Sequence, residues 1–392
     1  MRRTVRLKLD PTAEQAIAIK NTLQSFTRAF NYVCQYGWQD GEKNGVRLHH
    51  CTYYDVKGLC ADLVSDLIIQ ARVKATEALK SVAARQKAGR KAKQPQSELC
   101  PARYNIHTFK LSWDKQEVNL ATSPGNRIVI PFAIPKHAEK YIGYPTATAD
   151  LIYRKGSFYL HVGLTLPDVE FIPNGQVIGV DLGLNHPAVT SNRQFLGSNH
   201  WKEIDRRYFR LKRALQSKGT KSAKRHLKKL ANKQQRFHRD CDHVLAKRIV
   251  QSATPGTTIV IENLTEIRSR ARAKKGEGQR RLHSWSFAQM RSFLSYKAEE
   301  AGMQVVAIDP RHTSQTCSRC GFQHRSNRKS QSLFLCRSCS YRLNADLNAS
   351  YNIRAKHLAS LGISLASGPL STGLSSQLSE LGTSRLALAG GS

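Results

Sequence analysis

Two cysteine pairs near the carboxyl end have the spacing of a metal site. Cys317 and Cys320 lie in "TCSRCGF", and fifteen residues separate them from Cys336 and Cys339 in "LCRSCS". Two such knuckles offer four thiolates to one tetrahedral Zn²⁺ and leave no open coordination position for catalysis. Four unrelated buried thiols or a redox pair explain the pattern less well, because ribbon spacing accounts for both pairs together. The spacing predicts one structural zinc ion.

Three carboxylates stand at the ends of apolar runs or at the start of a helical pattern. Asp181 ends "QVIGV", Glu262 closes "TTIVI", and Asp346 opens "DLNASYNIRAKHLA". Singly, Asp181 is equally well explained as a turn former or helix cap, and Asp346 as a first-turn acid favoured by the helix dipole. Together, acids on a first strand, a later strand and a terminal helix are what an RNase H-like fold needs to hold two Mg²⁺ ions. The set predicts a site that hydrolyses phosphodiesters.

The first 100 residues or so combine one strand with helices. "RRTVRLKL" alternates with a period of two, as a strand does. Asp10 and Pro11 then have the residue types of an N-cap and a first helical position, so a helix is expected from there to about Trp38. A second helical pattern begins near Tyr54 and ends in "AARQKAGRKAKQPQ". We expect a helical insert after the first strand.

The rest of the chain divides into an all-β part and an α/β part. From about Arg103 to Pro167 the pattern has a period of two, with a hairpin turn expected at Lys155 and Gly156. After "LPDVEFIPNG", the strands "QVIGVDLG", "HPAVTSN", "TTIVIENL" and "MQVVAIDP" alternate with helical patterns. The expected fold is therefore a small antiparallel β domain followed by an α/β layer.

The chain is strongly basic. Its 62 Lys and Arg residues against 28 Asp and Glu residues give a formal net charge of +34 in 392 residues. The excess positive charges repel one another unless a polyanion neutralises them, so nucleic acid is the expected partner. Residues 202–236 contain fourteen Lys and Arg residues and two acids, too one-sided for an ordinary solvated face. The phosphate-binding candidates there are Arg206, Arg207, Arg210, Lys212, Arg213, Lys224, Arg225, Lys228 and Lys229.

Targeting signals are missing from the sequence pattern. "MRRTVRLKLD" lacks the apolar core of a signal peptide, and no window approaches the roughly 20 apolar residues of a membrane span. The five cysteines outside the two pairs are scattered and do not suggest a disulfide framework. We expect a cytoplasmic protein without a membrane partner.

The ordered motifs "GVDLG", "IVIENL", "TSQTCSRCG", "LCRSC" and "ADLNASYNI", behind a basic helical insert, resemble the TnpB (OrfB) family of insertion-sequence proteins. That family is related to compact type V CRISPR effectors and to Fanzor proteins, and the resemblance covers about residues 1–355. It implies a RuvC-like, Mg²⁺-dependent DNA endonuclease that binds a guide RNA from the transposon end and recognises a short motif beside double-stranded target DNA. Such a protein works in a prokaryotic cell and is nucleoid-associated when on DNA.

The resemblance also implies roles and domains. Asp181, Glu262 and Asp346 match the catalytic magnesium ligands, and the four paired cysteines match the zinc ribbon. The implied domains are a wedge β-barrel domain from 1–9 and 101–172, a helical recognition insert at 10–100, a RuvC-like domain at 173–313, a target-binding zinc ribbon at 314–342, a final RuvC-like helix at 343–357 and a disordered tail at 358–392.

Further nucleic-acid contacts are expected outside the basic helices. The run "RSRARAKKGEGQRR" resembles the family's mobile segment beside the active site, and it contains Arg268, Arg270 and Arg272. In guided systems base pairing supplies most of the sequence specificity, and the protein reads only a short flanking motif. The candidates for that contact are Tyr53, Tyr54, Gln70 and Lys74, each equally well explained as packing or surface.

Two positions depart from the family pattern, and two other functions stay open. Asn344 stands where many relatives have an acid, and Ser340 where many have glycine. A nuclease-inactive, RNA-guided DNA-binding regulator has the same architecture, and a transposase acting directly on DNA ends uses similar acids. A plain zinc-ribbon DNA-binding protein leaves Asp181 and Glu262 unexplained.

Overall fold

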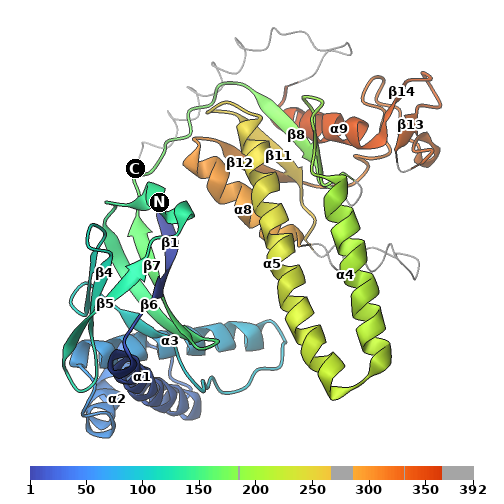
Figure 1. Ribbon diagram of the computed structural model, residues 1–392. Helices are drawn as coiled ribbons and strands as arrows, with labels where there is room; N and C mark the ends of the chain where they lie inside the picture. The colour runs from blue at the N-terminus through green and yellow to red at the C-terminus, as the bar shows by residue number, and fades with distance from the viewer. Residues whose placement is uncertain (184–185, 266–285, 331, 364–392) are drawn as a thin grey trace, which may run out of the picture. The chain divides into compact units, whose positions relative to one another are not determined.

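The structure is a computed structural model, and it describes residues 1–183, 186–265, 286–330 and 332–363. The chain divides into two compact units, Met1–Asp168 and the part from Val169 to the carboxyl end (Figure 1). No helix in these described ranges is long and apolar enough to cross a membrane.

The first unit is built on a seven-stranded antiparallel sheet. In the order in which they pair, the strands are β2 (Ala102–Tyr104), β6 (Thr146–Arg154), β7 (Ser157–Thr165), β1 (Arg2–Leu9), β5 (Arg127–Ala133), β4 (Glu117–Ala121) and β3 (Phe109–Ser112). The first strand lies at the centre, so its alternating Val5, Leu7 and Leu9 enter the core. Lys155 and Gly156 both have positive φ between β6 and β7, which confirms the hairpin turn.

This sheet is open, which corrects the expectation of a barrel. Its edges are β2 and β3, strands of three and four residues that do not pair with each other. Closure into a barrel requires the two edge strands to pair with each other, and β2 and β3 do not. The helices α1 and α3 instead pack against β2. The wedge expected at 1–9 and 101–172 is therefore a half-barrel.

Three helices form the expected insert, but two of their boundaries differ from the sequence prediction. They are α1 (Ala13–Gln39), α2 (Gly45–Leu59) and α3 (Ser65–Lys87). Thr12, and not Asp10, caps α1: its hydroxyl accepts from the Gln15 N–H, and the Gln15 side chain accepts from the Thr12 N–H. The second predicted helix is in fact two. Asp62, between them, accepts a hydrogen bond from Ser25 of α1, a tertiary contact that local periodicity does not encode.

The second unit contains the expected α/β layer. Its five-stranded sheet has the order β10 (Phe195–Leu196), β9 (Ala188–Thr190), β8 (Val177–Asp181), β11 (Thr258–Glu262) and β12 (Gln304–Ile308). The strands β8, β11 and β12 are parallel, whereas β9 and β10 add antiparallel strands. The helices are α4 (Asn199–Lys218), α5 (Lys221–Gln251), α8 (Phe287–Glu300) and α9 (Ala345–Ser360). A ribbon containing β13 (Leu333–Leu335) and β14 (Arg342–Asn344) precedes α9.

Helices cover the two faces of this sheet, and strand alternation decides which residue faces which helix. Ile178 and Val180 of β8 pack into one core with α5 and α8. Val177 of β8 and Val260 of β11 pack into the opposite core with α9. Because successive side chains alternate between faces, Asp181 shares the α9 face with Val177 and Gly179. Glu262 shares it with Val260 in the same way.

Gly179 lets α9 approach β8 more closely than any side chain allows. A Cβ added at Gly179 would lie 2.1 Å from the carbonyl oxygen of Ser350 and 2.7 Å from the amide nitrogen of Arg354. Asp346 lies one helical turn, about 6 Å, before Ser350. Asp181 lies two strand residues, about 6.6 Å, beyond Gly179. The contact at Gly179 thus brings the start of α9 to the carboxyl end of β8.

The final helix extends beyond the expected boundary. We expected it to end at 357, but α9 continues to Ser360. Leu358 and Ile363 are buried in the α9-side core, so the part 358–363 is not the tail that was predicted. Apolar residues that cover a sheet are fixed by burial, whatever the polarity of the sequence that follows. Residues 364–392 lie outside the described ranges.

The close approach at Gly179 makes a direct prediction. Gly179→Ala should lower the free energy of unfolding by about 1–3 kcal/mol or more, because backbone must move to admit a methyl group. Gly58→Ala is the matched control: the position is helical and nothing lies within 4 Å of an added Cβ. It should be neutral or stabilising by about 0.5–1 kcal/mol. Equal unfolding midpoints in urea for both variants would contradict the contact.

Candidate functional site

The three predicted carboxylates converge at the carboxyl ends of β8 and β11. Ile261 is in register with Val180, so Glu262 and Asp181 are the next residues of adjacent parallel strands. A cavity of about 360 Å³ lies beside them. Its lining is Asp181, Glu262, Asn263, Leu264, Thr265, Pro310, Thr313, Ser314, Arg328 and Ala349.

Burial makes Asp181 and Glu262 difficult to ionise, and repulsion from neighbouring acids adds to the effect at Asp181. Burial raises the pKa of Asp181 well above its ordinary value, and the charges of Glu262 and Asp346 raise it further, while Arg328 opposes the shift. Burial also raises the pKa of Glu262. The Thr313 hydroxyl opposes this rise by donating a hydrogen bond to Glu262 Oε1 at 2.6 Å. Ionised carboxylates are therefore unfavourable in this site by themselves, and a bound cation would stabilise them.

Asp346 is held at both carboxylate oxygens. Arg328 of the ribbon donates to Oδ1 at 3.1 Å, and His186 Nδ1 lies 2.8 Å from Oδ2. Asn344 caps α9 by accepting from the backbone N–H groups of Asp346 and Leu347. Asn344, predicted as a departure from the family pattern, thus serves as the helix cap.

The donor set fits a hard divalent cation. All three side chains offer carboxylate oxygen, the ligand that Mg²⁺ prefers, and a guanidinium already stands among them. Among the described residues, the four paired cysteines are the only group of three or more His, Cys, Asp or Glu residues that can place one ligand atom each within 4.8 Å of all the others. The ligand oxygens of the three carboxylates therefore do not all lie within 4.8 Å of one another, the distance that the cysteine sulfurs satisfy.

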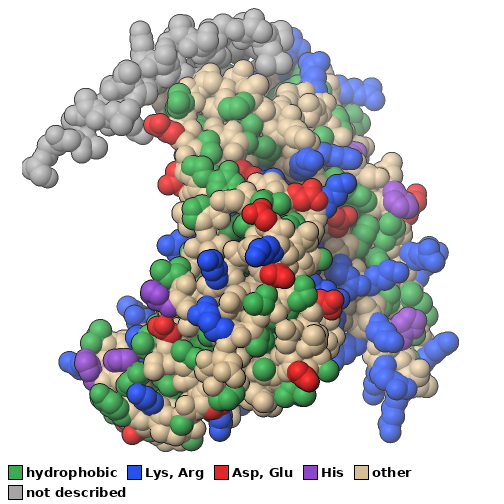
Figure 2. Space-filling model, turned by 60° about the vertical axis from the view of Figure 1, so that its left-hand side comes forward, with side chains coloured by type: hydrophobic (Ala, Val, Ile, Leu, Met, Phe, Trp, Pro, Cys, Tyr) green, Lys and Arg blue, Asp and Glu red, His purple; other side chains and the backbone are tan. Residues whose placement is uncertain are grey.

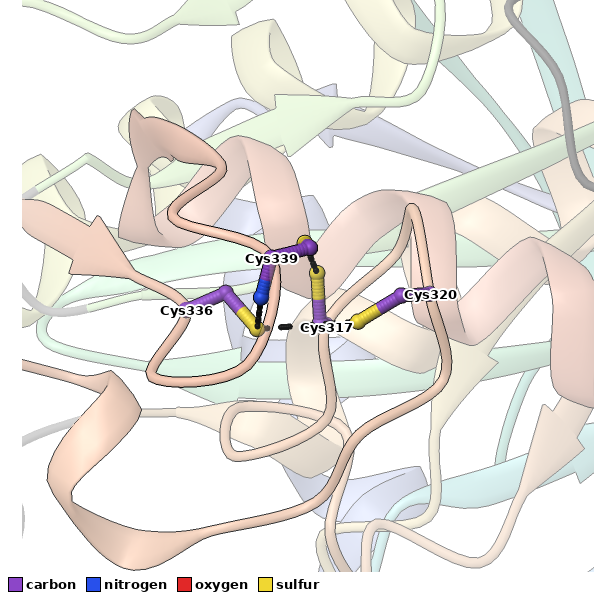
Figure 3. A group of neighbouring side chains, drawn as sticks. All are labelled: Cys317, Cys320, Cys336 and Cys339. Atoms are coloured by element: carbon purple, nitrogen blue, oxygen red, sulfur yellow. Dashed lines mark hydrogen bonds between the residues drawn. The ribbon is translucent and has the colours of Figure 1, made fainter.

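The four cysteines fit zinc. Their sulfur atoms point toward one another (Figure 3), with Cys317 to Cys339 at 3.7 Å and Cys320 to Cys336 at 3.6 Å. A tetrahedron with Zn–S bonds of about 2.3 Å has edges of about 3.8 Å. Burial disfavours the Cys336 thiolate, but hydrogen bonds from the N–H groups of Cys339 and Ser338 and from the Cys320 and Cys339 side chains lower the pKa of that thiol to about 7.

Two asparagines fasten the ribbon to α9. Asn348 Nδ2 donates to the Thr316 carbonyl at 2.8 Å, and its Oδ1 accepts from the Ser318 N–H at 3.0 Å. Asn352, one turn later, donates to the Thr313 and Thr316 carbonyls. These bonds connect the first cysteine knuckle to the turns of α9 that follow Asp346. Ser340 has a positive φ of 55°, a conformation that glycine adopts more readily than serine.

The predicted basic helices are α4 and α5, and their candidate residues are exposed. All nine Lys and Arg residues predicted at 206–229 are exposed to solvent. Leu215, Ala223 and Leu230 pack between the helices, with Tyr208 against them. In Figure 2, Lys and Arg side chains gather at lower right, over the helices α4 and α5. This pattern leaves the hairpin surface available to phosphates.

The flanking-motif candidates lie in the first unit in different settings. Tyr54 is 79% exposed, whereas Tyr53 packs against the core. Lys74 pairs with Asp150 at 2.9 Å, and Gln70 is half-buried. The predicted residues Arg268, Arg270 and Arg272 lie outside the described residues.

Sequence reasoning missed three groups around the carboxylates. His186, Thr313 and Arg328 all contact an acid, yet they come from a turn, a loop and the ribbon. The basic surroundings of Arg328 in "SNRKS" gave a charge signal only, and no local pattern marked the other two.

Zinc content tests the ribbon. Cys336→Ser should lose most of its zinc, because three thiolates and a hydroxyl bind the ion less tightly. The purified parent chain and the exposed-thiol control Cys51→Ser should each hold about one zinc ion when metal is measured by mass spectrometry. Zinc retained in Cys336→Ser at the parent level would contradict a four-cysteine site.

The raised pKa of Asp181 predicts a pH dependence of stability. A carboxyl whose folded pKa exceeds its unfolded pKa stabilises the fold below the unfolded pKa, and this contribution is lost as pH rises through the folded pKa. In EDTA, Asp181→Asn should therefore have the higher unfolding midpoint at pH 7.5, and the difference should shrink toward pH 4. A lower midpoint for Asp181→Asn at pH 7.5 would refute the repulsion.

Comparisons with known proteins add independent findings. A family model described as "Probable transposase" matches residues 167–284, and one described as "Cas12f1-like, TNB domain" matches residues 287–353. CRISPR-associated endodeoxyribonuclease Cas12f1 of Sulfoacidibacillus thermotolerans is 29% identical over 61% of this chain and 60% of that protein. A TnpB-like protein of Methanocaldococcus jannaschii is 25% identical over 63% of this chain and 92% of its own length. The putative RNA-guided DNA endonuclease InsQ of Escherichia coli is 30% identical over 47% of this chain and 49% of its own length.

A solved structure shares the fold. The Cas12f1 chain in a complex with a single guide RNA and target DNA superposes with a TM-score of 0.67 at 14% identity, over 90% of this chain and 98% of that one. The sequence matches span only 60% of Cas12f1 and 49% of InsQ. These findings confirm the resemblance predicted from the motifs: the chain is similar in sequence to TnpB-like proteins and to the compact Cas12f effectors.

Proposed function

We propose that this protein is a Mg²⁺-dependent, RNA-guided DNA endonuclease with a RuvC-like catalytic domain. The convergence of Asp181, Glu262 and Asp346, in a unit that also contains the basic helices α4 and α5 and the cysteine ribbon, carries the proposal. Relatives named as RNA-guided DNA endonucleases support it. Counted along the chain, the strands of the second unit have the order 3-2-1-4-5, with acids ending strands 1 and 4, which supports an RNase H-like assignment.

The three carboxylates would hold the magnesium ions. When bound, the ions supply Lewis acidity that activates water and stabilises the leaving 3′ oxygen of a phosphodiester. Thr313 orients Glu262, and Arg328 and His186 orient Asp346. The Arg328 side chain is 27% exposed and adds positive charge next to the position of an incoming phosphate.

Nucleic-acid binding falls to the basic surfaces. The exposed cations of α4 and α5 would neutralise phosphates of guide RNA or DNA, which gives affinity without sequence preference. Guide pairing would supply the sequence specificity, and side chains of the first unit would read a short flanking motif. The zinc-loaded ribbon, fastened to α9, would keep bound substrate next to Asp346. We place this activity in the cytoplasm of a prokaryotic cell, at the nucleoid when the protein is on DNA.

The decisive experiment uses protein purified without nuclease treatment. Copurifying RNA is sequenced, and Mg²⁺-dependent cutting is assayed on duplex DNA that matches the RNA 3′ end beside a randomised flank. Asp181→Ala should reduce cutting on the order of 10⁴-fold and retain guided DNA binding, because it removes a metal ligand and no phosphate contact.

Asp114→Ala is the matched control, since Asp114 is an exposed acid of the first unit. It should cut like the parent chain. Bound RNA without cutting by the parent chain would favour the nuclease-inactive regulator. Strand joining without any RNA would favour the transposase.

A further inference from the structure

We infer that His186 is a positioning residue for Asp346 and that it raises the affinity of the carboxylate site for divalent cations. This inference rests on the proposed function, because it assigns a partner to one of the proposed magnesium ligands. His186 lies between β8 and β9, and its Nδ1 is 2.8 Å from Oδ2 of an acid 160 residues away in the sequence. Asp346 is only 5% exposed, whereas the His186 side chain is 38% exposed.

The imidazole is held from two directions. Its ring meets the ring of Phe195 on β10 nearly at right angles, with centroids 5.3 Å apart. The main chain of His186 also folds back on Gly183, where an added Cβ would lie 2.8 Å from the His186 carbonyl oxygen. Because Gly183 follows Asp181 by two residues, this contact places the His186 main chain close in sequence and space to the end of the strand that carries the first carboxylate.

The imidazole completes the support of the Asp346 side chain. Arg328 already donates to Oδ1, and the Asn344 cap fixes the backbone at the start of α9. An ionised carboxylate only accepts hydrogen bonds, so His186 donates through Nδ1–H to Oδ2. With both oxygens engaged, rotation of the carboxyl group is restricted. Partners that orient a metal ligand in this way typically change metal affinity by about 10–100-fold.

The geometry separates two conservative replacements. In asparagine the amide nitrogen lies about where histidine has Nδ1, so His186→Asn can keep the donor to Asp346. His186→Ala removes the donor and the ring contact with Phe195. A role through the hydrogen bond predicts rescue by asparagine, whereas simple packing of the ring does not.

The test measures Mn²⁺ binding directly, so it does not depend on catalysis. Free Mn²⁺ is followed by electron paramagnetic resonance during titration of the full-length chain, and Asp181→Ala defines background binding. His186→Ala should bind Mn²⁺ about tenfold more weakly than the parent chain, and His186→Asn should restore the affinity to within about threefold.

Surface histidines also bind divalent ions, so His200→Ala is the matched control. His200 is an exposed residue at the start of α4, and its loss should leave the affinity unchanged. Unfolding midpoints in EDTA show whether each variant folds. Parent-like affinity in His186→Ala, or an asparagine variant as weak as the alanine variant, would overturn the inference. A parent chain that binds no more Mn²⁺ than Asp181→Ala would overturn the proposed metal site and this inference with it.

Discussion

The second unit depends on the contact between the backbone of α9 and the backbone of β8 at Gly179. No Cβ fits there, so the helix lies directly on the strand. The repeat distances of helix and strand then bring Asp346 level with Asp181. Alternation along β8 and β11 turns Asp181 and Glu262 to the same face of the sheet. The position of the carboxylate site thus follows from one missing side chain and two regular backbone geometries.

The site formed in this way is electrostatically strained, and its neighbours compensate only in part. Burial raises the pKa values of Asp181 and Glu262, and repulsion from Glu262 and Asp346 raises that of Asp181 further, while Arg328, His186 and Thr313 provide positive charge or donors. Acids that are costly to ionise together bind an added cation favourably, because the cation removes the repulsion. Residual strain at a site of this kind is expected where function requires a bound ion.

The ribbon and the site form one structural unit. The cysteine knuckles give a segment with little apolar core a fixed shape once four thiolates share an ion. Asn348 and Asn352 then join the knuckle to α9, and Arg328 extends from the ribbon to Asp346. This arrangement explains why a cysteine pair precedes an isolated carboxylate by so few residues. It also places a rigid surface beside the acids, in agreement with the proposed binding of target nucleic acid.

Much of this protein followed from the sequence alone, because the signals concerned are local. The Cys spacing, the hairpin at Lys155 and Gly156, the strands that end in Asp181 and Glu262 and the basic helices are all encoded within short windows. The motifs and their order along the chain also indicated the family. Tertiary structure alone decided the open sheet, the break between α2 and α3, and the burial of Leu358 and Ile363. It also decided that His186, Thr313 and Arg328 contact the acids. Each of these contacts joins residues that are distant in sequence or lie on different elements. Short-range periodicity does not encode which element packs against which.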